Sequence, residues 1–296
     1  MLISVLLRRL SRLSRDHVKN GRVGTPAQIG IVTKYNFLNY FRARRFYVML
    51  AIVVAISGLL SLVIAYRRPP NILSDPLAFY STAWGAFLSL IIIIMVAFFG
   101  GDAISGEFQN RTGYFLVPNP LRRSAIYIGK WLAAAAAASL TLAAYAVIIA
   151  LNGIYYFGTS LPSGFLQSIV FAWVLLAAAL AFQFMFSSLF KSSAISILMG
   201  VIMLLFVFGV IDLVSATFIG IEPWFSITYG AGIVTNILAP TGFPQHVITT
   251  TVGGARGFTL TTYNATVPEG LAILVAYFLA TGIVGLWLFE RKEFTS

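Results

Sequence analysis

The sequence contains no cysteine and only two histidines, and just 10% of its 296 residues are charged. Without cysteine the chain cannot form disulfides, thiolate metal sites, iron–sulfur clusters or a cysteine nucleophile. His17 and His246 are far apart in sequence, so a histidine-based metal cluster is not expected and no metal site is predicted. A soluble protein has about a quarter of its residues charged, whereas 59% of this chain is hydrophobic. The composition therefore argues against a large soluble domain.

Six apolar stretches are long enough to cross a bilayer. They have 20 to 23 residues each, contain Asp212 as their one charged residue, and contain no proline. At about 1.5 Å of helical rise per residue, each spans the roughly 30 Å hydrocarbon core of a membrane. The predicted spans are Phe46–Tyr66, Tyr80–Gly100, Trp131–Leu151, Phe165–Phe186, Ala194–Ala216 and Gly270–Phe289.

The basic residues predict how the chain is oriented. There are 20 Lys and Arg against nine Asp and Glu, a formal charge of +11. With a cytoplasmic N-terminus, 17 of these bases fall inside and only Arg67, Arg68 and Arg256 fall outside. The positive-inside rule then predicts a multi-pass plasma-membrane protein with both termini in the cytoplasm. The same distribution explains the basic excess, so no nucleic-acid partner is predicted.

The predicted fold class is an all-α polytopic membrane protein with an N-terminal interfacial elbow helix. Residues 1–45 are assigned to cytoplasmic basic amphipathic and elbow helices, and residues 46–296 to the transmembrane domain. Residues 1–20 indicate either a basic helix on the inner leaflet or a mobile basic tail. The elbow helix begins with Thr25-Pro26-Ala27-Gln28, which matches a capping box with proline at the first helical position.

The extracellular loop 217–269 is too long for a simple turn. Pro223–Leu238 indicates a short helix or a re-entrant pair. Val247–Val252 and Phe258–Tyr263 have strand-like composition on either side of five residues that include three glycines, which predicts a β-hairpin. Asn264-Ala265-Thr266 is a glycosylation sequon, so Asn264 is a candidate for modification.

Two further patterns concern the spans. Small side chains let helices approach closely, so the run Ala133–Ala138 predicts a central position for the third span. Trp173 is mid-span and is predicted to contribute to packing. The other four tryptophans lie at or near span ends, as in an aromatic belt at the membrane interfaces: Trp84, Trp131, Trp224 and Trp287.

Motifs for enzyme chemistry are missing. Gly129-Lys130 lacks the upstream glycine and the following Ser or Thr of a P-loop, and neither G-x-S-x-G nor H-E-x-x-H occurs. The chain is therefore not expected to be an enzyme, and it is expected to hold no cofactor of its own.

The segment 101–130 between the second and third spans has more features of a defined structure than a solvated loop requires. It has acidic residues, a short predicted helix, a Pro-Asn-Pro stop and a basic return to the membrane. It resembles the permease subunits of ABC type-2 exporters, which have an acidic residue, a hydrophobic-Ser-x-Glu run, a Gly-Thr pair, a proline, a basic pair and Gly-Lys. Arg111 departs from the glycine of many relatives. The matching residues here are Asp102, Ile104-Ser105, Glu107, Arg111-Thr112, Pro120, Arg122-Arg123 and Gly129-Lys130.

The resemblance implies a permease that forms the substrate path of an ATP-driven exporter. Two such subunits, identical or similar, would pair in the lipid and bind two separate ABC-type ATPase subunits, which hold ATP and Mg. Cargo is not specified, although apolar spans favour amphipathic, lipid-like or peptide molecules. The residues implied in coupling to the ATPase are Asp102, Glu107, Arg111, Thr112, Arg122 and Arg123.

Two other functions remain open from the residues alone, namely a secondary carrier or channel and a membrane-anchored enzyme subunit. An ion-coupled carrier usually needs buried ionisable residues, and Asp212 is the one candidate. For the permease, Glu107 is expected to contact the ATPase, whereas the simpler interpretation is that it balances nearby bases. Under the first interpretation Glu107→Lys weakens ATPase binding, and Arg122→Ala has a milder effect.

Overall fold

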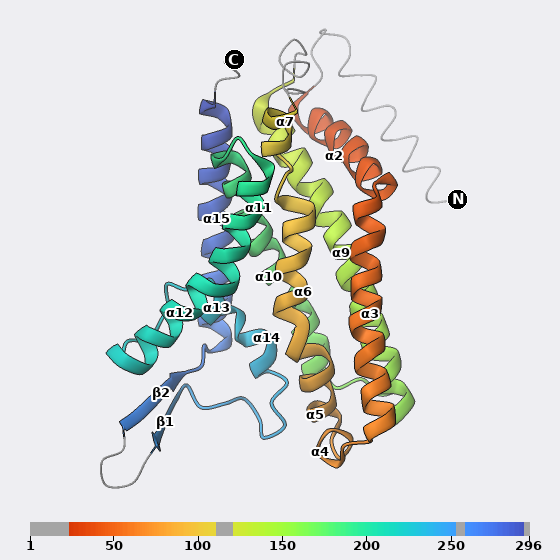
Figure 1. Cartoon of the computed structure of the whole chain (residues 1–296), viewed down its shortest axis with the longest axis vertical. Coiled ribbons are helices and arrows are strands. Elements are labelled where there is room, and N and C mark those ends of the chain that lie inside the picture. The colour runs from red at the N-terminus through yellow and green to blue at the C-terminus, as the bar shows by residue number, and fades with distance from the viewer. Residues whose placement is uncertain (1–23, 111–120, 253–257, 293–296) are drawn as a thin grey trace.

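The computed structural model describes residues 24–110, 121–252 and 258–292. Within them, six helices are long and apolar enough to cross a membrane, and every predicted span lies inside one of them. The all-α polytopic fold is thus confirmed (Figure 1). The predicted N-terminal basic helix, Arg111, Thr112, Pro120 and Arg256 lie outside the described residues. The six helices are Arg44–Arg67, Pro76–Gln109, Arg123–Phe157, Ser163–Leu189, Ser193–Ile219 and Val267–Arg291.

Several spans are built from more than one helical element, because π-helical turns (η) interrupt the regular α-helix. The second span contains one such turn and the fifth contains two. In chain order the elements are α2 (Thr25–Arg42), α3 (Arg44–Arg67), α4 (Pro70–Leu73), α5 (Pro76–Tyr80), η2 (Ser81–Gly85), α6 (Ala86–Gly100), α7 (Ser105–Gln109), α9 (Arg123–Phe157), α10 (Ser163–Leu189), α11 (Ser193–Ile202), η3 (Met203–Val207), α12 (Phe208–Leu213), η4 (Val214–Ile219), α13 (Ile227–Ala231), α14 (Ile233–Asn236), β1 (Val247–Val252), β2 (Phe258–Tyr263) and α15 (Val267–Arg291).

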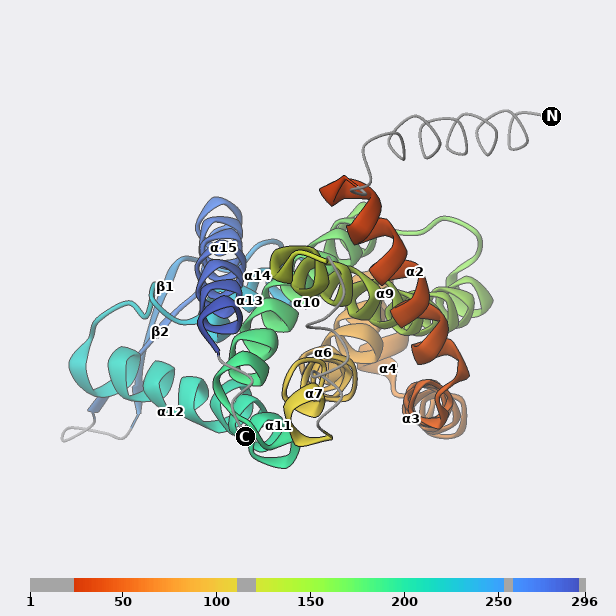
Figure 2. The same ribbon diagram turned by 90° about the horizontal axis from the view of Figure 1, so that it is seen from above.

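Helix α10 forms the centre of the bundle. It packs against α6, α9, α11 and α15, and Figure 2 shows it between α15 and the α6–α9 side of the molecule. Its sequence is apolar all round, and most of its second half is buried among these helices, while Leu166, Val170 and Trp173 in its first half are exposed. The alanine run of α9 is also in the core, since Ala133, Ala134, Ala137 and Ala138 are fully buried. The small side chains therefore serve close helix packing, as predicted.

Two tryptophans differ from the sequence prediction. Trp84 is completely buried, where its indole Nε1 donates to Ser168 Oγ at 2.9 Å and its ring stacks on Tyr145. The prediction of a belt position is wrong for Trp84, because α10 supplies a hydrogen-bond partner inside the bundle. Trp173 is 40% exposed, so it faces outward instead of filling the core.

The elbow helix α2 packs along the first turns of α9. It begins at Thr25 after Gly24, and no side chain caps it, so the predicted capping box is wrong. Gln28 is buried instead, and its Oε1 accepts a hydrogen bond from the Arg122 backbone amide at 3.0 Å. The two helices cross at Gly129, where an added Cβ would lie 2.7 Å from the Val32 side chain.

The loop between the fifth and sixth spans contains the predicted hairpin. Strands β1 and β2 pair antiparallel from Val247↔Tyr263 to Val252↔Phe258, which confirms both predicted strands. The short helices α13 and α14 lie within the predicted helical stretch Pro223–Leu238. The fifth span bends away from the bundle at α12, and η4 packs against β2 (Figures 1 and 2).

The molecule has two chemically different ends. Helices α2 and α7, the start of α9 and the end of α15 lie at one end, here named the α7 end, and the hairpin lies at the other (Figure 1). Of the 12 described Lys and Arg residues, ten belong to the α7 end. The other two are at the far end of α3, where Arg67 is its last residue and Arg68 follows it. The basic residues predicted to be cytoplasmic thus share one end of the bundle.

Candidate functional site

The five-residue helix α7 and the residues around it form a polar cluster, named here the α7 site. Helix α6 ends at Gly100, and Gly101 allows close approach to the second turn of α11, because an added Cβ would meet Ile197 at 2.3 Å. The first amides of α7 find their acceptor on α10, where Ser187 Oγ accepts from Ile104 N at 2.9 Å and Ser105 N at 3.0 Å. At the other end of α7, Gln109 Oε1 accepts from Ser193 N of α11 at 2.7 Å. Helix α7 is therefore attached to both neighbours.

Two ion pairs connect the segment to α3 and α9. Arg45 Nη1 donates to both carboxylate oxygens of Asp102, at 2.7 and 2.8 Å. Lys130 Nζ donates to the Ala103 carbonyl at 2.8 Å and pairs with the Glu107 carboxylate. The Lys130 and Glu107 side chains are 10% and 23% exposed, whereas Arg45 is 41% exposed. The Lys130–Glu107 pair is thus the better shielded one, and removing either partner would leave a poorly solvated charge.

A polar cavity of about 200 Å³ lies among these groups. Tyr40 at its edge donates to the Phe99 carbonyl at 2.7 Å. Burial, reinforced by the Asp102 charge, raises the pKa of Tyr40 above its usual range, so the hydroxyl stays a neutral donor. The polar and charged residues that line the cavity are Asn36, Asn39, Tyr40, Arg45, Asp102, Glu107, Asn110 and Lys130.

The end of α15 closes the other side of the site. Arg123 Nη1 donates to the backbone carbonyls of Glu290 and Lys292, at 2.8 and 3.0 Å. Lys292 Nζ donates to the Ser188 and Phe190 carbonyls at the end of α10 and lies 4.2 Å from the centre of the Phe108 ring. Burial, together with the nearby Lys191 charge, lowers the pKa of Lys292 to about 8. The last turns of α10 and α15 are thereby joined to α7.

The whole arrangement lies within a region that matches a known family. A family model described as ABC-2 family transporter protein matches residues 30–294, from the elbow helix past the end of α15. The chain belongs to the ABC-2 transporter family. The resemblance seen in the sequence is confirmed, and the protein is a multi-pass membrane permease component of an ABC transporter. A comparison with curated proteins finds no match.

The permease brings together some of its predicted coupling residues and separates others. Asp102 and Glu107 both line the 200 Å³ cavity, each paired with a base. Arg122 and Arg123 lie 15 or more residues later, at the start of α9, where they contact α2 and α15 instead. Arg111 and Thr112 are outside the described residues, and a role in coupling stays a prediction for all six.

Several residues of the α7 site were not singled out in the sequence. Arg45 was noted only as a base of the elbow region and Lys292 only as part of the basic C-terminal tail, and Ser187 and Gln109 belong to no recognised motif. Their partners are remote in sequence, as Ser187 is 82 residues from Ser105. At the other end of the permease, Asn264 is half-buried and its Nδ2 donates to the Gln245 carbonyl at 2.9 Å, and its glycosylation stays a prediction.

Proposed function

We propose that this permease moves cargo out of the cell by coupling to two separate ABC-type ATPase subunits, with α7 as the contact element. The observation that supports this is the attachment of α7 to three helices at once. Ser187 connects it to α10, Gln109 to α11 and Lys130 to α9. A displacement of α7 by a partner is thus passed to the packed core, which responds by rearranging as a unit.

The proposed assembly contains two permease subunits, identical or similar, in the plasma membrane, with ATP and Mg held by the ATPase. The α7 end faces the cytoplasm in this proposal, since it contains ten of the 12 described bases. A secondary carrier is less well supported, because such a carrier usually needs an ionisable residue deep in the membrane. Asp212 lies instead in the outer part of the fifth span, where its Oδ2 accepts from Thr228 at 2.5 Å.

The exposed end of α7 offers a direct test of the ATPase contact. Asn110 is exposed and follows the last residue of the helix, so Asn110→Arg is expected to leave the internal ion pairs intact. Forcing a charge into a desolvated interface should lower both copurified ATPase and cargo-stimulated ATPase activity by roughly tenfold or more. Glu107→Lys would be a poorer test, because it also brings two ammonium groups together at Lys130.

Asn71→Arg is the matched control, since Asn71 is equally exposed but lies on α4 at the hairpin end. It should copurify with the ATPase as the unmodified permease does. If Asn110→Arg retains full copurification and activity at equal expression, α7 is not the contact element.

Positions 71 and 110 also test which end of the permease faces the cytoplasm. Because the chain has no cysteine, Asn71→Cys and Asn110→Cys each create a single reactive thiol. We expect an impermeant maleimide to label Asn71→Cys in intact cells and Asn110→Cys only after the cells are permeabilised. The reverse pattern would place the α7 end outside and would remove the proposed ATPase contact with it.

A further inference from the structure

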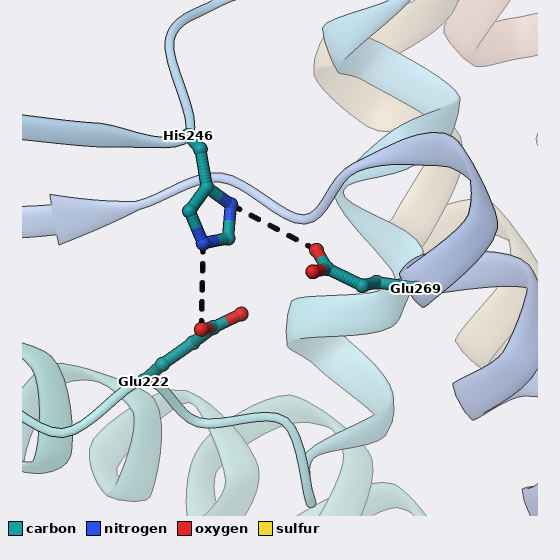
Figure 3. A group of neighbouring side chains, drawn as sticks. All are labelled: Glu222, His246 and Glu269. Carbon is teal, nitrogen blue, oxygen red and sulfur yellow. Dashed lines mark ion pairs between the residues drawn. The ribbon is translucent and has the colours of Figure 1, made fainter.

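Three side chains with metal-binding chemistry meet at the hairpin end, on the opposite side of the bundle from the α7 site (Figure 3). Glu222 lies between η4 and α13, His246 directly precedes β1, and Glu269 is in the first turn of α15. One ligand atom from each residue lies within 4.8 Å of those of the other two. Three separate elements of the outer loop and the last span thus contribute to one cluster.

The hydrogen bonds of His246 determine which ring nitrogen is free. Its Nδ1 lies 3.0 Å from the backbone carbonyl of Asn264, which can only accept, so Nδ1 must hold a proton. In the neutral ring, Nε2 then points a lone pair at Glu222 Oε2, 3.4 Å away. Two electron-rich atoms at this distance attract a positive charge between them, which is either a proton on Nε2 or a metal ion. A carbonyl on the second nitrogen is also the usual way in which a metal-binding histidine is oriented.

The distances and charges suit a small divalent ion. In a tetrahedral zinc site, ligand atoms bound at about 2.0–2.2 Å lie about 3.3 Å from one another. The Nε2–Oε2 distance of 3.4 Å is close to that value. Glu269 Oε2 is 3.8 Å from Nδ1, the other ring nitrogen, so this carboxylate must turn toward Nε2 to reach the same ion, and its side chain, 44% exposed, has room to do so. Among the described residues, neither carboxylate has a Lys or Arg within 4.0 Å.

Both carboxylates are oriented by groups outside the cluster. Tyr229 donates its hydroxyl hydrogen to Glu222 Oε1 at 2.5 Å, and the Thr266 amide donates to Glu269 Oε2 at 3.0 Å. Burial, with the hydrogen bond to Glu222, raises the pKa of Tyr229 above its usual range, so it remains a donor. Glu222 thus keeps Oε2 for another partner, whereas the Glu269 oxygen nearest the histidine, Oε2, is also the one that accepts from Thr266.

We propose that Glu222, His246 and Glu269 bind a divalent transition-metal ion of the Zn²⁺ class. The imidazole nitrogen selects such ions over Ca²⁺ and Mg²⁺, which prefer oxygen ligands. The bound ion would join the segment after η4 and the start of β1 to the first turn of α15. This role is separate from the ATPase contact and does not depend on it.

Three conservative variants test the site without breaking its hydrogen bonds. Glu269→Gln preserves the capping box at Thr266, since glutamine serves equally well at that position. Glu222→Gln keeps an acceptor for Tyr229, and His246→Gln keeps a donor for the Asn264 carbonyl. Glu290→Gln is the matched control, because Glu290 is an exposed carboxylate of the same helix α15 at its opposite end.

The full-length permease is purified, freed of its affinity tag and stripped of metal with EDTA. It is then titrated with Zn²⁺, Mg²⁺ or Ca²⁺ in a calorimeter, and the bound zinc is counted by mass spectrometry. We expect one zinc per chain in the unmodified protein and in Glu290→Gln, and roughly tenfold or more weaker binding in each cluster variant. Mg²⁺ and Ca²⁺ should bind far more weakly. Absence of zinc binding, or equal affinity in the three cluster variants, would overturn the proposal.

Discussion

Lys130→Met is expected to destabilise the permease by about 2–4 kcal/mol, because the shielded Glu107 carboxylate loses its ion pair with the Lys130 ammonium. The Ala103 carbonyl also loses the hydrogen bond from Lys130. Methionine preserves the volume of the lysine stem, so the cost comes from the lost ion pair and hydrogen bond and not from a cavity. The loss of one of the three attachments of α7 should also lower cargo-stimulated ATPase activity by roughly tenfold. Thermal unfolding in detergent measures the first effect and reconstituted ATPase activity the second.

A second substitution tests whether the broken ion pair causes this loss of stability. If the lost ion pair is responsible, Glu107→Gln in the Lys130→Met background should recover most of the unfolding temperature. Lys34→Met removes an exposed lysine of α2 and should change stability by no more than about 0.5 kcal/mol. A double variant no more stable than Lys130→Met alone would show that the ion pair is not what fixes α7.

Gly129→Leu is expected to separate the elbow helix from the bundle. A Cβ at this position would lie 2.7 Å from the Val32 side chain and 3.1 Å from the Ile29 carbonyl of the backbone, so a rotamer change alone cannot relieve the clash. Overpacking of this kind costs about 1–3 kcal/mol, and here it is relieved most easily by moving α2 away. Val32 is 9% exposed, and it should then become accessible to solvent.

Val32→Cys reports this movement, because the chain offers no other thiol. Its reaction with maleimide should become roughly tenfold faster or more when Gly129→Leu is added, a change that follows directly from the opened contact. Gly58→Leu makes the same change at a glycine of α3 with no atom within 4 Å of its added Cβ, and it should leave Val32→Cys protected. Equal protection in both backgrounds would mean that the α2–α9 contact tolerates the larger side chain.

The spans and the hairpin were predictable because their signals are local. A run of β-branched residues beside a glycine-rich turn gave β1 and β2 with their observed bounds, and apolar runs located each span. Helix ends were less predictable, since α9 begins at Arg123, eight residues before the predicted span at Trp131. Hydrophobicity marks the part of a helix that lies in lipid, whereas the polar turns of α9 continue because α2 packs against them.

The α7 site was predictable only in part, since its motif residues have partners elsewhere in the chain. Glu107 and Lys130 were recognised in the family pattern, and Glu107 was considered as a balance to nearby bases, but nothing local indicated that Lys130 is the base with which it pairs. Gln28 shows the same limit. It was predicted to take part in a helix cap, but its side chain instead accepts a hydrogen bond from a backbone amide 94 residues away. The metal-binding cluster has no local signature in the sequence, because it combines one histidine with two separate glutamates. Its single His246 is more than 20 residues from both Glu222 and Glu269.

The hydroxyl of Ser187 affects the order in which α7 and α10 fold during synthesis of the permease. A helix of five residues is far shorter than the roughly 12–15 needed for stability in isolation, so α7 depends on acceptors from elsewhere. Ser187 supplies them from the fourth span, although α7 is synthesised more than 80 residues earlier. The ribosome must therefore deliver α10 to the bilayer, and α10 must pack, before α7 acquires its shape. If the ATPase binds this surface as proposed, its recruitment would be delayed until the first four spans have folded, and an incomplete chain would not assemble prematurely.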